Sequence, residues 1–383
     1  MQGTELSPDA LRQRSATAAY AFRGYNVSNL GRTRELLEHP AYGSIVDVKL
    51  GEASEAASGI LGRRIDLAGR VRGGEETTLA VYDEAIALVL AAEIAQLQLL
   101  KEHFGVIYGD AQLAMGYSLG EIGALVAGGV IDLESALRVP LGLADDCVAL
   151  ADDVTLGVLF SRGSPIEMDE VLRCCLLINS AGGGVVGVSA ILSPNSCLVM
   201  GQGDTLQQLR ERVTELPPGG LHLRANSNRW PPLHTPIVWQ RAIPDRASVI
   251  MHSLPGGFCA PSTPVLSLVT GEISYTDLNV REIIRDWVDH PQRLWDAVYR
   301  TLSAGVKTVL HVGPEPNIIP STFNRLRDNV AAQTEGRVGV RALKSMVNRP
   351  WLKALLPERT ALLRALDVEQ VIVEDWLLAN EPE

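Results

Sequence analysis

The sequence predicts an α/β fold with two parts: a core built on a short parallel sheet, and a small α/β subdomain inserted into that core. Three observations predict it. Runs of four or five mostly apolar residues, such as 265–268 and 308–312, are typical of strands in a buried sheet. A strand, a tight turn with a glycine at each end and a helix follow one another over 111–128. The segment 154–223 has the pattern of four strands and two helices in the order β-α-β-β-α-β.

The composition is that of a globular, acidic protein. Of the 383 residues, 46% are hydrophobic and 21% are charged, and the formal net charge is −11. This is enough apolar material for a sizeable core, and the length suits two or three domains or one large domain with an insertion. Because the chain is acidic and has no run of Lys or Arg, we expect neither nucleic acid nor an anionic membrane surface as a partner.

The cysteines and the apolar segments predict a cytoplasmic protein. The five cysteines are sparse and no pair has the spacing of zinc ligands, so we expect reduced thiols and no metal site. No stretch reaches the roughly 18 apolar residues that span a bilayer. The first residues lack the apolar segment of a secretory signal. We therefore expect no insertion into a membrane.

Residues 1–74 are expected to form a helical region that packs on the core. Their pattern includes two helices around a hinge at 22–32, which is either an ordered loop that closely approaches another group or a simple turn between helices. Over 78–104, apolar residues recur at helical spacing and predict a long helix. Gly105 is the expected left-handed residue at the end of that helix.

The core is expected to comprise residues 75–153 and 229–330. Asp132 is a typical N-cap for the helix that follows it, and Pro140 should kink that helix. The elements expected in the core after the long helix are strands at 111–115, 265–268 and 308–312 and helices at 119–128, 133–150, 236–253, 280–288 and 291–302.

The inserted subdomain, 154–228, is expected to be ferredoxin-like, because it has the element order of that arrangement. Residues 331–383 are expected to be a helical C-terminal extension. The sequence leaves open whether the two terminal regions wall the active site or form the contact of a homodimer. The elements expected in the subdomain are strands at 154–160, 184–192, 196–200 and 221–223 and helices at 166–177 and 205–216.

A candidate nucleophile lies in the turn Gly116-Tyr117-Ser118-Leu119-Gly120, which matches the Gly-x-Ser-x-Gly pattern of the α/β-hydrolase nucleophile elbow. A serine in such a sharp turn needs small residues two positions before and after it. The helix that follows offers free amides, that of Leu119 among them, and the positive end of its dipole to an oxyanion. The alternative is a tight strand-to-helix turn with a capping serine.

The serine needs a base, and His234 is the best placed of the seven histidines. It lies in Pro231-Pro232-Leu233-His234-Thr235-Pro236, where prolines on both sides restrict the backbone and so suit a side chain that must be aimed. The alternative is a solvated loop histidine without a catalytic role.

The stretch 116–129, GYSLGEIGALVAGG, resembles the nucleophile segment of the malonyl-CoA:acyl-carrier-protein transacylase family, which includes the acyltransferase domains of fatty acid and polyketide synthases. Residues 233–236, with His234 lying 116 positions after the serine, resemble its catalytic-histidine segment. Residues 310–314 resemble its late Val-Gly-Pro turn, and 193–201 resemble a hairpin of its ferredoxin-like subdomain. The resemblance covers about residues 75–330, in the family's order.

The resemblance implies an enzyme with a Ser118–His234 dyad that moves an acyl group from coenzyme A to the phosphopantetheine thiol of an acyl carrier protein, without a cofactor. Ser118 would attack the thioester carbonyl while His234 takes its proton, and an acyl-serine ester would form. In this family a backbone carbonyl orients the histidine, and the matching segment 286–291 places that carbonyl near Trp287.

Two departures from the family pattern bear on the acyl group. Tyr117 stands beside the nucleophile where the family has a histidine, and with Leu233 it is expected to shape the acyl pocket. Leu143 stands in the position of the arginine that holds a malonyl carboxylate. Since burying an unpaired carboxylate costs several kcal/mol, this predicts a neutral acyl group, unless Arg229 enters the pocket.

A third departure concerns the oxyanion. The family's N-terminal loop supplies a glutamine to the oxyanion hole, and no such loop occurs here. The hinge at 22–32 stands in its place, so Asn26 or Tyr25 is the candidate donor. A missing donor would cost about 3–4 kcal/mol of transition-state stabilisation.

Two alternative functions stay open at the level of the sequence. A thioester hydrolase on the same scaffold would resolve the acyl-serine with water, and it too would have no use for the missing arginine. A non-catalytic partner protein that kept the fold would account for Tyr117 and the altered loop, although the intact Ser118 and His234 count against it.

Overall fold

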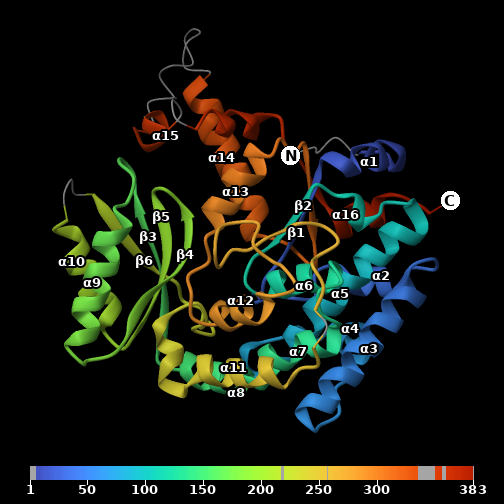
Figure 1. The fold of residues 1–383 in the computed structure, drawn as a ribbon, viewed down its shortest axis with the longest axis horizontal. Coiled ribbons are helices and arrows are strands. Elements are labelled where there is room, and N and C mark those ends of the chain that lie inside the picture. The colour runs from blue at the N-terminus through green and yellow to red at the C-terminus, as the bar shows by residue number, and fades with distance from the viewer. Residues whose placement is uncertain (1–5, 217–219, 257, 335–349, 356–358, 383) are drawn as a thin grey trace.

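The computed structural model describes residues 6–216, 220–256, 258–334, 350–355 and 359–382. It has two parts that lie side by side (Figure 1). The larger part holds a parallel sheet surrounded by helices, and the smaller part holds an antiparallel sheet.

The core sheet has five strands within the described residues, in the order β7-β2-β1-β8-β9, and each neighbouring pair is parallel. Strands β1, β2 and β8 are buried at every residue, which is why their sequences are almost continuously apolar. The predicted α/β fold with a short parallel core sheet is confirmed. The strands are β1 (Ala18–Phe22), β2 (Leu113–Gly116), β7 (Val265–Leu266), β8 (Thr308–Val312) and β9 (Glu369–Ile372).

The N-terminal region is not purely helical, which corrects the expectation for residues 1–74. Strand β1 lies in the middle of the core sheet, between β2 and β8. Its sequence, Ala-Ala-Tyr-Ala-Phe, is too short to show a strand period, and alanine favours helices in isolation. Pairing with two distant strands decides its conformation. The helices around it are α1 (Pro8–Arg14), α2 (Thr33–Glu38), α3 (Gly43–Leu61) and α4 (Leu67–Gly73).

The C-terminal extension is not purely helical either. Strand β9 pairs with β8 at the edge of the core sheet, and α16 (Val373–Ala379) follows it. Before it lie α15 (Pro350–Leu355) and the 3₁₀ helix η7 (Thr360–Leu366). Residues 335–349 of the expected helical extension fall outside the described residues.

The long helix predicted before the elbow is α5 (Tyr82–Phe104), which is buried along most of its length. Gly105 ends it in the left-handed conformation, with a φ of 63°, and its amide donates to the carbonyls of Leu100 and Lys101. This C-terminal glycine was predicted and is confirmed. Because an L-residue with a side chain is strained at this φ, glycine is the natural choice.

Two of the expected helices are divided. In place of one kinked helix over 133–150, α7 (Leu133–Gly142) ends two residues after Pro140, and α8 (Ala144–Ala151) follows. In place of 236–253, the 3₁₀ helix η4 (Pro236–Arg241) meets α11 (Ile243–Ser253) at Ala242. The other core helices are α6 (Leu119–Ala127), α12 (Val280–Trp287), α13 (Leu294–Ser303) and α14 (Ile318–Thr334).

The small part is an antiparallel sheet in the order β4-β5-β3-β6, with α9 and α10 on its outer face (Figure 1). This is the ferredoxin-like arrangement that the element order predicted. A cluster of apolar residues lies between the helices and the sheet. The elements are β3 (Val154–Ser161), α9 (Met168–Ser180), β4 (Val186–Ser193), β5 (Ser196–Gln202), α10 (Thr205–Thr214) and β6 (Leu221–Ala225).

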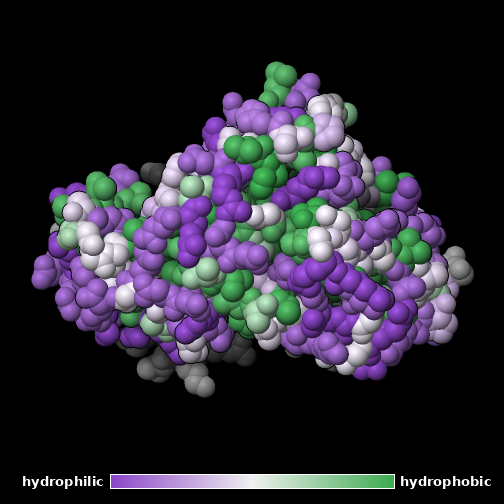
Figure 2. All heavy atoms as spheres, turned by 90° about the horizontal axis from the view of Figure 1, so that it is seen from below, coloured by the Kyte–Doolittle hydropathy of each residue, from purple (hydrophilic) through white to green (hydrophobic). Residues whose placement is uncertain are grey.

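The surface seen from below is mostly hydrophilic, with apolar residues in scattered patches (Figure 2). Scattered apolar residues are normal on folded proteins. Among the residues that the structure describes, no helix is both long enough and apolar enough to cross a membrane.

Candidate active site

The Gly-x-Ser-x-Gly turn is a sharp elbow between β2 and α6. Ser118 has a φ of 53°, a conformation that costs free energy in any residue other than glycine. A Cβ on Gly116 would lie 2.0 Å from the carbonyl group of Gly120, and one on Gly120 would lie 2.3 Å from the carbonyl oxygen of Phe22. Only glycine fits at both positions, so the elbow packs directly against the end of β1.

The structure brings Ser118 and His234 together although 116 positions separate them. The Oγ of Ser118 lies 2.7 Å from Nε2 of His234. The other ring nitrogen, Nδ1, lies 2.7 Å from the carbonyl oxygen of Trp287. The backbone amide of His234 donates to the carbonyl of Val288 at 2.7 Å. This geometry suits a base aimed at the serine; the catalytic roles of these groups stay predictions.

The His234 ring is buried and uncharged at neutral pH. Its side chain is shielded from water, and this burial lowers the pKa to about 4, against the opposing effects of the Trp287 carbonyl and of Asp289. Because Nδ1 faces a carbonyl oxygen, we assign the proton to Nδ1, which leaves the lone pair of Nε2 directed at Ser118. A neutral histidine in this tautomer can accept the serine proton.

The structure supplies candidate oxyanion donors on two sides of Ser118. On one side the amide of Leu119 lies at the N-terminus of α6. On the other, the chain after β1 passes close by, since a Cβ on Gly24 would lie 3.3 Å from Cβ of Ser118. The backbone amide of Asn26 is already bonded to Oδ1 of Asn29, so only its side chain, on the cavity wall, is available. Tyr25, which also lines the cavity, is the other candidate that the sequence indicated.

The hinge at 22–32 is an ordered loop that a buried arginine holds together. Arg23, only 3% exposed, donates to the carbonyls of Gly24, Ser28 and Pro314 and to Oδ1 of Asn29. Burial lowers its pKa to about 10, and the nearby carboxylates, that of Glu93 first, oppose this. This role of Arg23 was not predicted from the sequence, where its one signal is a cation directly after an apolar run.

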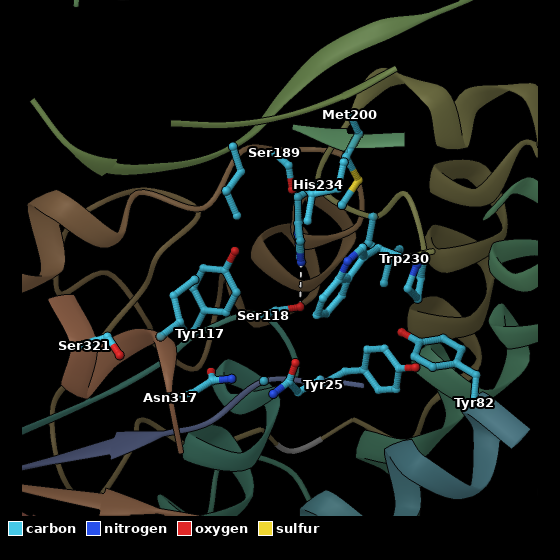
Figure 3. A pocket seen from close by; sticks show the side chains of 17 residues that line it. Tyr25, Tyr82, Tyr117, Ser118, Ser189, Met200, Trp230, His234, Asn317 and Ser321 are labelled. Atoms are coloured by element: carbon cyan, nitrogen blue, oxygen red, sulfur yellow. Dashed lines mark hydrogen bonds between the residues drawn. The ribbon is translucent and has the colours of Figure 1, made fainter. Parts of the chain in front are cut away.

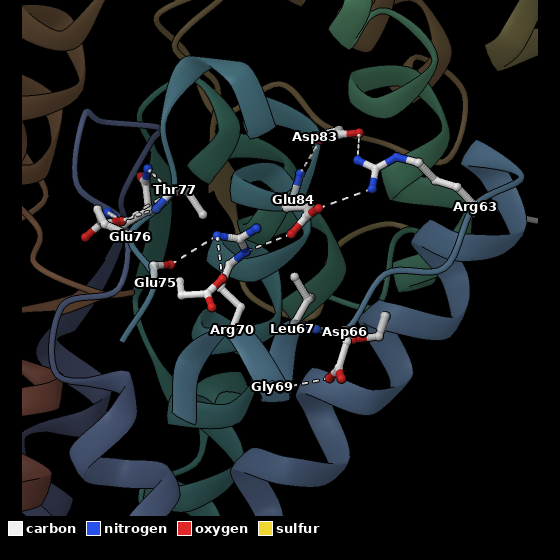
Figure 4. A network of polar contacts seen from close by, with 12 residues as sticks. Arg63, Asp66, Leu67, Gly69, Arg70, Glu75, Glu76, Thr77, Asp83 and Glu84 are labelled. Atoms are coloured by element: carbon white, nitrogen blue, oxygen red, sulfur yellow. Dashed lines mark hydrogen bonds and ion pairs between the residues drawn. The ribbon is translucent and has the colours of Figure 1, made fainter. Parts of the chain in front are cut away.

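A second set of contacts ties the same loop to the start of α5. The backbone amide of Asn29 donates to Oε1 of Glu76, and its side-chain amide donates to Oγ1 of Thr77; both acceptors precede that helix. Figure 4 shows Glu76 and Thr77 beside an ion-pair network in which Arg70 of α4 holds Glu84 of α5. The loop over Ser118 is therefore fixed from both ends.

A cavity of about 370 Å³ opens beside Ser118, and no Asp, Glu, Lys or Arg lines it among the described residues. Figure 3 shows the Ser118–His234 hydrogen bond at its centre, with Tyr117 on one side and Tyr82 and Trp230 on the other. Leu233 lines it as well. The lining residues are Gly24, Tyr25, Asn26, Tyr82, Tyr117, Ser118, Leu156, Ser189, Leu198, Met200, Trp230, Pro231, Leu233, His234, Asn317, Ile318 and Ser321.

Two residues that the sequence analysis linked to the acyl pocket lie elsewhere. Leu143 is not among the residues that line the cavity; it is buried in the hydrophobic core where α7 meets α8. The division of the expected helix at this residue explains the difference. Arg229 does not enter the cavity, and its guanidinium pairs with Asp152 at the surface.

Two further side-chain contacts at the elbow have no sequence motif that could have revealed them. Gln292 is fully buried, and its Oε1 accepts a hydrogen bond from the Ser118 amide at 2.9 Å. The indole N–H of Trp287 donates to the Ser118 carbonyl at 2.9 Å. Contacts between segments so distant in sequence leave no local pattern.

Glu121, in the first turn of α6, is fully buried as well. Burial raises its pKa to about 7, and it accepts hydrogen bonds from the Leu268 amide and the Tyr275 hydroxyl. It thereby ties α6 to the segment that follows β7.

The sequence is related to polyketide synthases and to a transacylase. It is 25% identical over 381 residues to the polyketide synthase GfsB of Streptomyces halstedii, covering 94% of this chain and 6% of that protein. It is 21% identical over 286 residues to the malonyl CoA-acyl carrier protein transacylase of Bacillus subtilis, covering 75% of this chain and 66% of that one. No family model matches the chain.

The same fold appears among solved structures. The malonyl-CoA:acyl carrier protein transacylase FabD of Xanthomonas oryzae has a TM-score of 0.65 at 23% identity, over 81% of this chain and 91% of that one. An acyl carrier protein S-malonyltransferase of Vibrio cholerae has a TM-score of 0.63 at 19% identity, over 93% of this chain and 96% of that one. These likenesses establish the shared fold.

The chain is thus similar in sequence to a malonyl CoA-acyl carrier protein transacylase and to parts of polyketide synthases, and it has the fold of the malonyl-CoA:acyl carrier protein transacylases. It spans a small part of the polyketide synthases that it matches, 6% of GfsB and 14% of the NorB protein of Streptomyces orinoci. What those large proteins do as a whole therefore does not transfer to it.

The elbow's close packing predicts a large cost for any side chain at residue 120. We expect Gly120→Ala to lower the free energy of unfolding by about 3 kcal/mol, because the carbonyls of Phe22 and Arg23 lie within 2.5 Å of the added Cβ. Urea unfolding followed by circular dichroism measures this. Gly59→Ala in α3 is the matched control, since nothing lies within 4 Å of its Cβ. Equal stabilities of the two variants would contradict the close approach.

The low pKa of His234 predicts a pH-dependent contribution to stability. The folded protein keeps this ring neutral down to about pH 4, whereas an exposed histidine takes up a proton near pH 6.5. Its contribution to the free energy of unfolding is therefore full above pH 6.5 and falls as the pH drops toward 4. We expect the stability difference between the natural protein and His234→Gln to shrink between pH 7 and pH 4.5. A stability difference that does not change with pH would show that His234 has an ordinary pKa in the folded protein.

Proposed function

We propose that this protein is an acyltransferase that moves a neutral acyl group from coenzyme A to the phosphopantetheine thiol of an acyl carrier protein. One observation carries the proposal: a serine and a neutral histidine in hydrogen-bond contact open onto a cavity without charged side chains. The family relationship supplies the class of substrates, since the related Bacillus protein is named for its action on malonyl-CoA and an acyl carrier protein.

The proposed reaction proceeds in two half-reactions. Oγ of Ser118 attacks the thioester carbonyl while Nε2 of His234 takes the hydroxyl proton, and the tetrahedral oxyanion faces the amide of Leu119 and the loop at 24–26. Collapse breaks the carbon–sulfur bond, and the imidazolium protonates the departing thiolate. The carrier thiol then gives its proton to His234 and attacks the acyl-serine ester. The bond between the acyl carbon and Oγ breaks, and the imidazolium returns the proton to Oγ of Ser118.

The cavity favours an uncharged acyl group. A malonyl carboxylate inside it would have no cationic side chain to pair with among the described lining residues, and burying such a charge costs several kcal/mol. The walls are instead aromatic and apolar, with the phenol groups of Tyr25, Tyr82 and Tyr117 held protonated because burial raises their pKa. Neutral acyl chains meet no such penalty.

A groove next to the cavity supports a phosphate-bearing donor and acceptor. Leu156 lines the cavity, and Val158 and Phe160, on the same face of β3, line the groove. On α14, Ser321 lines the cavity and Arg325, one turn further, lines the groove. The two spaces thus follow the same pair of elements.

Three arginines line this groove: Arg162, Arg224 and Arg325. None of them forms an ion pair with a carboxylate in the described part of the chain. The groove has a volume of about 650 Å³. Free guanidinium groups are the usual ligands of phosphate in proteins, and coenzyme A and carrier-bound phosphopantetheine both carry phosphate.

Intact-protein mass spectrometry tests the acyl-enzyme and the choice of acyl group. After brief exposure to acetyl-, butyryl- or malonyl-CoA, we expect an adduct from the neutral thioesters at least tenfold faster than from malonyl-CoA, because only malonyl must bury a charge. Ser118→Ala should form none. Added carrier protein should then discharge the adduct.

Three outcomes would redirect the proposal. Faster labelling by malonyl-CoA would refute the preference for neutral groups. If water hydrolyses the acyl adduct on Ser118 at a rate that added carrier protein does not change, the protein would be a thioester hydrolase. Complete absence of an adduct with every thioester would favour a non-catalytic partner protein.

The arginine groove predicts a binding defect that leaves the chemistry intact. We expect Arg224→Gln combined with Arg325→Gln to raise KM for acyl-CoA about tenfold, through the loss of charge-assisted hydrogen bonds to phosphate, with kcat within about twofold. Arg138→Gln is the matched control, because Arg138 is an exposed arginine on α7 that already pairs with Glu134. An unchanged KM in the double variant would place the phosphates elsewhere.

A further inference from the structure

Gln292 is a buried residue that joins the core to the small subdomain. It lies in the segment between α12 and α13, and its side chain is fully shielded from solvent. Its backbone amide donates to the carbonyl of Ser189, and its carbonyl accepts from the amide of Ile191, so its backbone is paired with β4 of the small subdomain. The residue therefore cannot shift independently of either part.

The carboxamide of Gln292 reaches both members of the Ser118–His234 pair. Its Oε1 accepts the amide hydrogen of Ser118 at 2.9 Å. Its Nε2 lies 3.3 Å from Nδ1 of His234. Because an amide N–H can only donate, the oxygen must face Ser118, and this leaves the NH₂ group facing the imidazole.

The NH₂ group of Gln292 does not donate a hydrogen bond to a lone pair of the imidazole. Nδ1 already gives its hydrogen to the Trp287 carbonyl at 2.7 Å, so it has no free electron pair for the NH₂ group of Gln292. The positive end of the amide dipole therefore lies against the edge of the ring. A positive dipole end opposes a positive charge on that ring, because no water screens the two groups in this buried site.

We propose that Gln292 is a positioning residue, which holds the Ser118 amide in the strained elbow and keeps the His234 imidazole unprotonated by placing its NH₂ group against Nδ1. The inference rests on the proposed function of Ser118 and His234 and adds a third side chain to them. It acts through the serine backbone and the ring, and does not touch the thioester.

The other ionisable groups around the ring are few among the described residues. Asp289, on the same segment as Gln292, is the one whose charge reaches His234, and its carboxylate is bonded to Trp239 and His290. From the elbow, Tyr117 presents a phenol that burial keeps protonated. From β4, the nearby Ser189 does not titrate. A change at residue 292 should therefore be visible in the titration of His234.

Replacing the NH₂ group of Gln292 by an oxygen separates its two proposed roles, which are to hold the Ser118 amide and to keep His234 unprotonated. Gln292→Glu keeps an oxygen for the Ser118 amide and turns the group beside Nδ1 into an acceptor of its hydrogen. We expect the His234 pKa to rise by at least one pH unit, because a carboxylate now stabilises the imidazolium. Gln292→Leu removes both contacts and should slow the reaction of Ser118 at least tenfold at every pH.

The readouts are the imidazole ¹⁵N shifts of His234 and the rate at which a fluorophosphonate labels Ser118 between pH 4 and pH 8. For Gln292→Glu, we expect the acid limb of the labelling profile to move upward with the ¹⁵N titration, while the plateau above pH 7.5 stays within about threefold of the natural protein. Gln202→Glu is the matched control, since Gln202 is a mostly buried glutamine of β5 whose side chain bonds Gln240. It should leave both readouts unchanged.

Two outcomes would overturn the inference. An unmoved His234 titration in a folded Gln292→Glu protein, checked by its melting temperature, would show that the NH₂ group does not act on the ring. Full labelling of Gln292→Leu would show that the serine amide needs no partner. If the fluorophosphonate labels Ser118 with these dependences and no thioester does, the proposed acyl transfer fails while the role of Gln292 stands.

Discussion

The close approach of the elbow to the end of β1 is the constraint on which the rest of the site depends. The amide of Tyr117 donates to the carbonyl of Phe22, and Gly120 lies against the same carbonyl. Gly24 in turn leaves room for the carbonyl of Tyr117. Since no side chain fits at these contacts, the nucleophile and the loop over it form one rigid unit, and the strain at Ser118 can persist because its surroundings leave no alternative.

Burial then sets the electrostatics of that unit. It lowers the pKa of His234 and raises that of the tyrosines around the cavity, so the groups near Ser118 are neutral at physiological pH. Among the described residues, charged side chains lie outside the cavity: Arg23 is bonded within the loop at 22–32, and the arginines of the adjoining groove pair with no described carboxylate. Under the proposed function, this arrangement would place the reacting thioester in an uncharged space and the phosphates of its carrier in a charged one.

The inserted subdomain contributes walls to the cavity and support to the base. Leu156, Leu198 and Met200 of its sheet face the cavity, and His234 follows soon after its last strand. Strand β4 pairs with Gln292, whose side chain reaches back to the elbow. The position of the base relative to the nucleophile thus depends on how the subdomain packs against the core.

The sequence by itself determined what short stretches of chain can specify. The elbow glycines, the cap at Gly105 and the element order of the subdomain depend on local sterics and turn chemistry, and the structure has them where the pattern placed them. The tertiary structure decided the rest. Strand β1 becomes a strand because two distant strands pair with it, and Gln292 meets Ser118 across 174 positions. Leu143 lies in the core because its helix ends there. Such contacts join segments that the chain brings together only on folding, so no local pattern records them.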